Sequence, residues 1–362
     1  TYADKMDTIP TIKEIVKESG GKFCVIKNST YLKEALELKK IVEYSMPKHF
    51  FFYSTPNDVV GNLILNIIDG ACTRYLINLT DHAFWLGSQC IDKCIEFRDY
   101  GASVSKDYRN ISTDKIVKIP FYPIINMEQS FEGYPFELQS SSKVVFSGGG
   151  LYKTISKNNY YYKIVDYILE NFNDTIFWYA GSGDKTRLNE LVKKYPKRIF
   201  ITEERKDLFQ VLEHSYFYLS TYPICGGLMF QYAATAGKIP LTLKANDDVN
   251  GYLLNQSNLG IIYENFDEFL IELKHILEDP EYTEKKGKHL KQTVISEREF
   301  DEEIFRLFKG QDGKFVIKFE NIDSVAFRSL YKERMEKKEV EITLCTKKDW
   351  IVVKYITVIY IK

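Results

Sequence analysis

The sequence predicts an α/β protein made of two domains, each with a parallel sheet covered by helices. Its 362 residues are too many for one ordinary core and fit two domains of common size. Short β-branched or aromatic runs also alternate with helical stretches in two separate blocks. Because parallel strands need a crossover connection, this alternation indicates two parallel sheets.

The first block follows an opening helix at residues 9–19. Strands are predicted at residues 23–26, 49–53, 74–79, 94–97 and 116–121, and helices at residues 32–44 and 57–68. The numbering opens with Thr1 and runs directly into a helix. We therefore expect a native first strand and its loop to be missing from it.

The second block is more regular. Its predicted strands are residues 143–147, 175–180, 198–202, 216–220 and 239–243, and its helices are residues 160–171, 185–194, 207–214, 228–236, 266–277 and 281–307. This order predicts a doubly wound domain. The domain assignment is residues 1–127, a polar linker at 128–142, a second domain at 143–310, and a short mixed C-terminal extension at 311–362. The extension is expected to hold a charged helix near residues 323–337 and an alternating stretch at 350–361 without an assigned role.

Composition excludes several classes of protein. Lys plus Arg (49) nearly balances Asp plus Glu (50), so no long-range field attracts nucleic acid. The six cysteines are scattered and suggest reduced thiols, and Cys90 and Cys94 lack the further ligands of a metal set. No apolar run approaches the ~20 residues of a spanning helix, and the start does not resemble a signal peptide. We expect a cytoplasmic protein with no metal or other cofactor and at most peripheral contact with the inner face of the membrane.

Glycine-rich loops follow the first two strands of the second block. Residues 148–154 read Gly-Gly-Gly-Leu-Tyr-Lys-Thr, and residues 181–187 read Gly-Ser-Gly-Asp-Lys-Thr-Arg. Glycines let a backbone approach a phosphate, and lysines add charge; the candidates are Gly149, Gly150, Lys153, Gly181 and Lys185. The spacing fits neither a dinucleotide fingerprint nor a P-loop, and simple tight turns are the alternative.

A third loop precedes the helix at residues 228–236. It contains Gly226 and Gly227, and the helix that follows opens with Leu228 and small residues. The amides at such a helix start can lie against a diphosphate. Gln231, one turn further on, could bind a ribose hydroxyl.

In order, these motifs resemble bacterial GT-B glycosyltransferases, whose two Rossmann-like domains face each other across a cleft and assemble cell-surface glycans. The matching segments are residues 79–87, 96–103, the glycine loop before Lys153, 179–183 and 223–240. The resemblance implies that the second domain holds a nucleotide-sugar, UDP- or GDP-linked, with Ile201 near the base. It implies a glycan or lipid-linked saccharide acceptor on the first domain, and no bound metal. Retaining members carry two glutamates where Pro223 and Gln231 stand here, so the stereochemistry stays unassigned.

His82 and Asp81 are the candidate catalytic residues. They follow a predicted strand, where a histidine could accept the proton of an acceptor hydroxyl. The alternative is a helix cap made by the pair. Trp85 and Arg98 are candidate contacts for the acceptor or a phosphate; the alternatives are a core position for Trp85 and an ion pair of Arg98 with Glu96 or Asp99.

Two other functions stay open. One is a non-catalytic GT-B-like subunit that binds a partner enzyme or glycan, which the absence of the glutamate pair favours. The other is a sugar-nucleotide epimerase, which is expected to carry more carboxylates and histidines in its cleft. An NAD-dependent enzyme is disfavoured because the glycine spacing fails.

Overall fold

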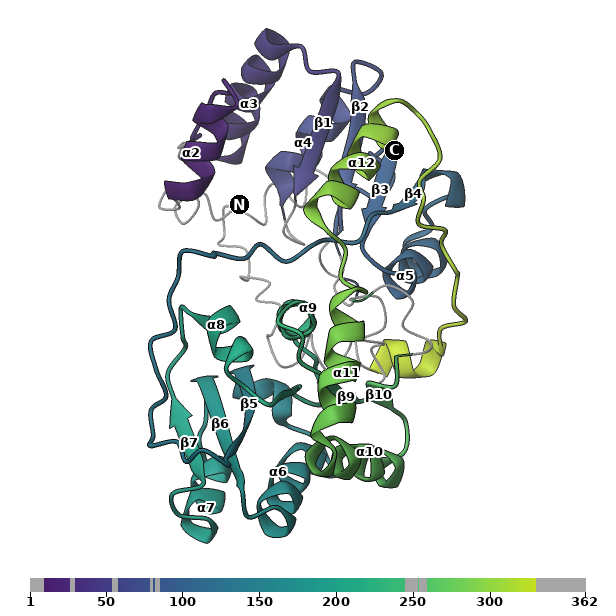
Figure 1. Ribbon diagram of the computed structural model, residues 1–362. Coiled ribbons are helices and arrows are strands. Elements are labelled where there is room, and N and C mark those ends of the chain that lie inside the picture. The colour runs from purple at the N-terminus through teal and green to yellow at the C-terminus, as the bar shows by residue number, and fades with distance from the viewer. Residues whose placement is uncertain are drawn as a thin grey trace. The chain divides into compact units, whose positions relative to one another are not determined.

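The computed structural model describes residues 10–26, 30–53, 58–78, 81, 85–244, 253 and 259–329. These residues form two compact units, each an α/β arrangement around a parallel sheet (Figure 1). The first unit contains the described residues up to Ile119 and again from Gly310 onward, and the second contains Pro120–Lys309. The chain thus enters the first unit twice, a return that no sequence pattern predicted.

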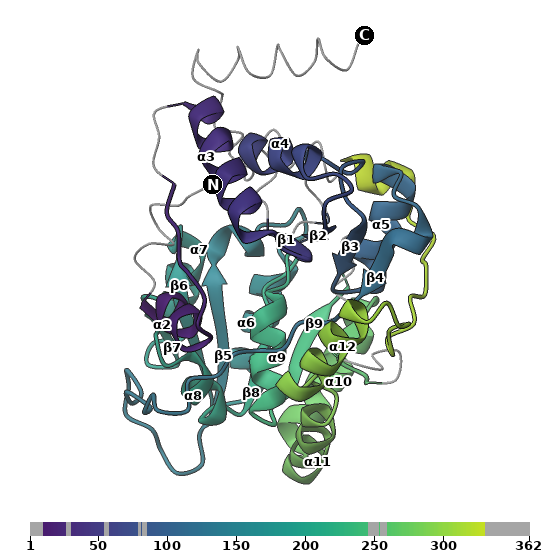
Figure 2. The same cartoon turned by 90° about the horizontal axis from the view of Figure 1, so that it is seen from above.

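The first unit has a four-stranded sheet in the order β1-β2-β3-β4, with every neighbouring pair parallel. Its strands are β1 His49–Tyr53, β2 Thr73–Ile77, β3 Lys93–Glu96 and β4 Ile116–Lys118. Its helices are α2 Pro10–Glu18, α3 Tyr31–Ser45, α4 Val59–Ile67 and α5 Asp99–Arg109, with the 3₁₀ turn η1 Thr113–Lys115. Helices α3 and α4 lie side by side (Figure 2). Phe52, Leu65, Leu76 and Cys94 form the centre of the core.

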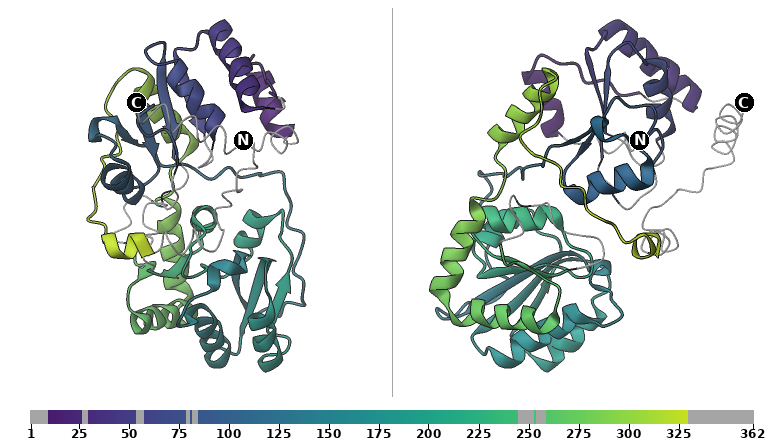
Figure 3. Two further views of the ribbon diagram at one scale, coloured as in Figure 1. Left: turned by 180° about the vertical axis from the view of Figure 1, so that it is seen from behind. Right: turned by 90° about the vertical axis from the view of Figure 1, so that its right-hand side faces the viewer.

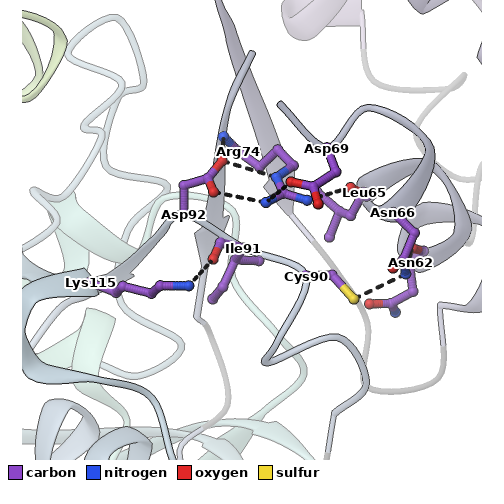
Figure 4. Close-up of polar contacts among 9 residues, drawn as sticks. All are labelled: Asn62, Leu65, Asn66, Asp69, Arg74, Cys90, Ile91, Asp92 and Lys115. Carbon is purple, nitrogen blue, oxygen red and sulfur yellow. Dashed lines mark hydrogen bonds and ion pairs between the residues drawn. The ribbon is translucent and has the colours of Figure 1, made fainter. Parts of the chain in front are cut away.

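An ion-pair network around the buried Arg74 links the amino-terminal end of β2 to the partly exposed Asp92 and the exposed Asp69 (Figure 4). Arg74 has 6% exposure, and its guanidinium donates to both carboxylate oxygens of Asp92 at 2.9 and 2.8 Å. It also donates to the Leu65 carbonyl at 2.9 Å and pairs with Asp69 at 2.7 Å. The hydrogen bond from Arg74 lowers the pKa of Asp92 against the opposing effect of burial. This network lies at the opposite end of the strand from Asn78 and Asp81, so it stabilises the unit without joining the candidate site.

The second unit has a six-stranded parallel sheet in the order β10-β9-β8-β5-β6-β7. Its strands are β5 Lys143–Gly150, β6 Thr175–Ser182, β7 Ile199–Thr202, β8 Phe217–Leu219, β9 Pro240–Leu243 and β10 Ile262–Tyr263. Its helices are α6 Tyr160–Asn171, α7 Thr186–Lys194, α8 Leu208–Glu213, α9 Gly227–Thr235, α10 Phe266–Glu278, α11 Pro280–Lys291 and α12 Glu297–Phe308, with the 3₁₀ turn η2 Leu151–Thr154. Helices cover both faces of this sheet (Figure 3). Phe146, Phe177, Trp178 and Tyr218 have 0% exposure and fill the core between the layers.

The segment that precedes β5 is fastened along the second unit. Phe131 stacks on the His214 ring at a centroid distance of 4.1 Å, and Phe136 meets Trp178 edge-on at 5.9 Å. The Glu132 amide donates to the buried carboxylate of Asp207 at 2.8 Å. The stretch predicted as a polar linker therefore packs on the second unit through aromatic and backbone contacts.

Most predicted elements are confirmed within a few residues. The strand at residues 49–53 and the helix at residues 160–171 coincide with β1 and α6. The glycines predicted as loops lie partly inside strands, because β5 runs through Gly150 and β6 through Ser182. The predicted strand at residues 116–121 ends earlier, at Lys118.

Two predictions of secondary structure were wrong, and one helix was missed. Residues 23–26 form no strand; the Phe23 ring is exposed and lies 5.6 Å from the Lys13 ammonium. The helix predicted at residues 281–307 is two helices, because Ser296 forms a capping box with Glu299 that begins α12. Helix α5 was missed because its six buried residues are consecutive, from Tyr100 to Ser105, and mix apolar residues with glycine and serines without helical spacing.

The predicted C-terminal extension packs partly on the first unit. The Lys318 amide donates to Asp99 at 2.9 Å, the Glu320 amide donates to Ser103 at 2.8 Å, and Phe327 meets the Tyr108 ring at 4.2 Å. Residues 324–329 are helical, within the range predicted for the charged helix. The rest of that helix and the stretch at residues 350–361 lie outside the described residues.

Candidate functional site

The second sheet reverses its strand order between β5 and β8. From β5 the chain proceeds outward through β6 to β7, and β8 then pairs with the other edge of β5. In open parallel sheets, ligands bind outside the carboxyl ends of the strands at such a switch point. The loops after β5 and β8 flank this position, so they define the candidate ligand site of the second unit.

The carboxyl ends of β5 and β6 are in backbone contact. Gly149 faces Gly181 in the register, and a Cβ on Gly181 would lie 1.9 Å from the Gly149 carbonyl oxygen. Gly149 has a φ of 119° and Gly183 a φ of 112°, values that favour glycine. The two predicted glycine loops therefore meet with no side chain between them, which leaves backbone groups at the edge of the sheet.

The loop after β8 is held against the turn after β5. The Ile224 amide donates to the Lys153 carbonyl at 3.2 Å, and the Thr221 hydroxyl donates to the Ile224 carbonyl at 2.6 Å. Helix α9 begins at Gly227 with Gly226 as its N-cap, and the cap forms no side-chain hydrogen bond. The positive end of the helix dipole is therefore available for an anion at the switch point.

The structure brings Gly149, Gly150, Lys153, Gly181 and the α9 start into one region. They come from the ends of β5 and β6 and from α9, with Gly226, Gly227 and the half-exposed Leu228 at the helix start. Lys153 is half-buried on η2. Phosphate contacts by these residues stay a prediction.

Three further donor candidates lie elsewhere or have other contacts. Lys185 forms an ion pair with the exposed Glu203 near the end of β7. Ile201 lies in β7, opposite Tyr179 of β6 and half-buried. Gln231 has 1% exposure, and its amide donates to the Phe121 carbonyl at 2.6 Å. This contact ties Gln231 to the segment before β5, and its predicted ribose contact stays untested.

In the first unit, Asp81 and Arg98 form an ion pair at the carboxyl ends of β2 and β3. Arg98 Nε donates to Asp81 Oδ2 at 2.7 Å, and the two side chains keep only 10% and 12% exposure. The partner of Arg98 is thus neither Glu96 nor Asp99, the carboxylates suggested by sequence proximity. Asp99 pairs instead with Lys118 at 2.7 Å.

Trp85 lies in the core beside this pair. It has 6% exposure, and the Arg109 guanidinium carbon lies 4.9 Å from its ring centroid. Arg109 also donates to the Asp81 carbonyl at 3.0 Å. Trp85 therefore occupies the core position that the sequence analysis gave as the alternative, and a contact between Trp85 and the acceptor stays a prediction. His82 lies outside the described residues.

Glu96 joins this cluster, and the sequence analysis did not select it. It has 0% exposure and accepts hydrogen bonds from Asn78 at 3.0 Å, from the Ser105 hydroxyl and from Cys94 at 3.3 Å. Burial and the charge of Asp81 together raise the pKa of Glu96 to about 7, against the opposing effects of Arg109 and of the hydrogen bonds from Ser105 and Asn78. The usable signal was a charged residue at the end of a short apolar strand, because a charged residue that is buried needs partners, which often belong to a site.

Among the described residues, no group of three or more His, Cys, Asp or Glu side chains is placed to hold a metal ion. No helix in the described part of the chain is long and apolar enough to cross a membrane.

The two parallel sheets, each flanked by helices, give the chain a GT-B glycosyltransferase-like fold. HepE of Anabaena, solved in complex with UDP and glucose, is similar with a TM-score of 0.59 and 12% identity, over 83% of this chain and 89% of that chain. A glycosyltransferase from Rickettsia africae is similar with a TM-score of 0.59 and 11% identity, over 83% and 87% of the two chains.

A structure with another activity is similar as well. UDP-GlcNAc 2-epimerase from Neisseria meningitidis, bound to UDP-GlcNAc, has a TM-score of 0.53 and 14% identity, over 82% of this chain and 88% of that chain. The sequence matches no protein-family model, and a search of curated proteins found no match either. The structural similarities establish the fold, which hosts both transferases and epimerases.

Proposed function

We propose that the chain is a nucleotide-sugar-dependent glycosyltransferase that uses a UDP- or GDP-linked donor. The observation that carries this proposal is the meeting of three amide-rich segments at the switch point of the second sheet. The Gly149 and Gly181 strand ends are in contact, and the α9 start is hydrogen-bonded to the turn after β5.

These segments suit a diphosphate for a physical reason. Backbone amides at a helix start point outward and carry partial positive charge, so they stabilise an anion without a bound metal. The same arrangement would stabilise the charge that develops on a leaving diphosphate during transfer. Lys153 would add a mobile cation to these fixed amides. The UDP in the HepE structure and the UDP-GlcNAc in the epimerase structure favour a uridine nucleotide.

For the first unit, we propose that Asp81 and its neighbour His82 act on an acceptor hydroxyl. Asp81 keeps 12% exposure and is held by Arg98, as a general base or its orienting partner requires. The acceptor would be a glycan or lipid-linked saccharide in cell-surface polysaccharide synthesis. The reaction would then take place in the cytoplasm or at the inner face of the membrane, because the scattered cysteines fit a reducing compartment.

A second candidate function is a sugar-nucleotide epimerase. The sequence analysis disfavoured it because an epimerase is expected to carry several carboxylates near the sugar. The structure adds Glu96 to Asp81: both carboxyl groups approach Gly101, whose Cβ would lie 2.6 Å from an oxygen of each. A carboxyl group whose pKa is raised to about 7, as that of Glu96 is, suits proton removal and return near neutral pH.

Binding and turnover separate these functions. Calorimetry with UDP, GDP and their sugars should show binding by the wild type, and Gly181→Ala should bind more weakly. Incubation with the best donor, with and without added saccharide acceptors, should then release nucleotide only when an acceptor is present. Conversion of the donor to an epimer would support the second function, and binding without turnover would support a non-catalytic subunit. No binding of any nucleotide would refute both the transferase and the epimerase.

A further inference from the structure

A fully buried carboxyl group that the proposed reaction does not use lies directly behind Asp81. Glu96 ends β3 with 0% exposure, and Asp81 lies beyond the end of the neighbouring β2. Asp81 Oδ1 and Glu96 Oε2 each lie 2.6 Å from the point that a Cβ on Gly101 would occupy. The glycine in α5 therefore lets the helix approach both carboxyl groups at once.

The two carboxyl groups have different partners. Asp81 is paired with the Arg98 guanidinium at 2.7 Å. Glu96 receives its hydrogen bonds from the neutral donors of Asn78, Ser105 and Cys94. Complete burial and the neighbouring charge of Asp81 favour the protonated acid of Glu96, whereas its hydrogen bonds and the charge of Arg109 favour the anion.

Charged and titratable groups face Glu96 from each element packed against it. They are Cys94 from β3, Asp81 from the segment after β2, and Arg109 from α5. Burial raises the pKa of Glu96 to about 7, so this group exchanges its proton near neutral pH. Each loss of the proton places a second negative charge beside Asp81, where like charges repel.

We propose that Glu96 is a positioning residue for Asp81: as a neutral acid it leaves Asp81 paired with Arg98, and as an anion it drives the Asp81 carboxylate from that position. The effect on turnover rests on the proposed function, because Asp81 must contact the substrate for the rate to change. The effect on the Asp81–Arg98 pair does not depend on the proposed function.

The first experiment follows turnover between pH 5.5 and 9 in the full chain. The wild type should lose kcat on the alkaline side with a midpoint near 7, while KM for the donor stays constant. Glu96→Gln should keep kcat near the wild-type maximum and abolish the alkaline decline, because the amide cannot become an anion beside Asp81. Glu96→Ala should abolish the decline as well. Glu272→Gln, which removes a comparably enclosed carboxylate from the second unit, should keep the wild-type profile.

The second experiment needs no turnover. The Nε–H resonance of Arg98, assigned by comparison with Arg98→Lys, should titrate with a midpoint near 7 in the wild type and stay constant in Glu96→Gln. A resonance that titrates identically in both proteins, or in neither, would overturn the proposal even in an active enzyme. A titrating resonance in a protein that turns over no sugar donor would support the coupling and refute the proposed function.

Discussion

Replacing Glu96 by glutamine should change how the stability of the first unit depends on pH. The ordinary pKa of the group is 4.5, and the fold raises it to about 7 because burial and the charge of Asp81 favour the neutral acid. Its contribution to stability is therefore fully present below about pH 4.5 and is lost as the pH rises through 7. The difference between these pKa values corresponds to about 3 kcal/mol of unfolding free energy.

Hydrogen exchange at increasing urea concentration measures this effect locally. Because the chain has two units, a global unfolding curve would mix them, whereas peptides from β2 and β3 report on the first unit. The advantage of Glu96→Gln over the wild type should grow by about 3 kcal/mol between pH 4.5 and 8. The Glu272→Gln control should show no such trend in these peptides. If the difference in unfolding free energy between Glu96→Gln and the wild type were constant across the pH range, the assignment of a raised pKa to Glu96 would be refuted.

Three further predictions concern the rest of the molecule. Gly181→Ala should weaken UDP binding at least tenfold in calorimetry, because its Cβ would lie 1.9 Å from the Gly149 carbonyl oxygen. The control Gly237→Ala, at a φ of 71° with no atom within 4 Å of its Cβ, should cost only about 1 kcal/mol of stability. If both variants lost UDP affinity equally, the argument from the Gly149–Gly181 contact would be contradicted. Arg74→Met should destabilise the first unit by about 1–3 kcal/mol, because it removes the hydrogen bond of a buried guanidinium to the Leu65 carbonyl and its pairing with the partly exposed Asp92 and the exposed Asp69 carboxylates. That loss should shrink in acid as these carboxylates take up protons, and a deficit that persists unchanged at low pH would argue against it. Lys153→Ala should reduce the rise in melting temperature caused by UDP, and an unaltered rise would remove Lys153 from the site.

The sequence was sufficient for the parallel sheets because strand-to-helix alternation leaves few topologies. The sequence also located the loops at the switch point, because the glycines at the ends of β5 and β6 and before α9 form recognisable motifs. Local signals failed where tertiary contacts decide the structure. Helix α5 presents Gly101 and Ser105 to a charged cluster and buries six consecutive residues, so its apolar residues do not recur at helical spacing. The Arg98 pair joins residues 17 apart, and proximity in sequence suggested the wrong carboxylates.

Glu96 shows the same limit for the candidate site. A glutamate after an apolar strand is visible in the sequence, but its complete burial beside Asp81 depends on the register of β2 and β3 and on the approach of α5. Its pKa follows from those distances, because burial and a neighbouring charge both act through space. The chemistry of this cluster therefore became visible only with the fold.

The way residues 120–142 pack has a practical consequence for dividing the protein. A fragment that began at Lys143 would lack Phe131 and Phe136, which pack on His214 and Trp178, and the Glu132 amide, which donates to the Asp207 carboxylate. Such a fragment would expose aromatic side chains that the full chain covers, and it would aggregate readily. A fragment spanning Pro120–Lys309 retains that covering and is the natural unit for isolated nucleotide-binding work.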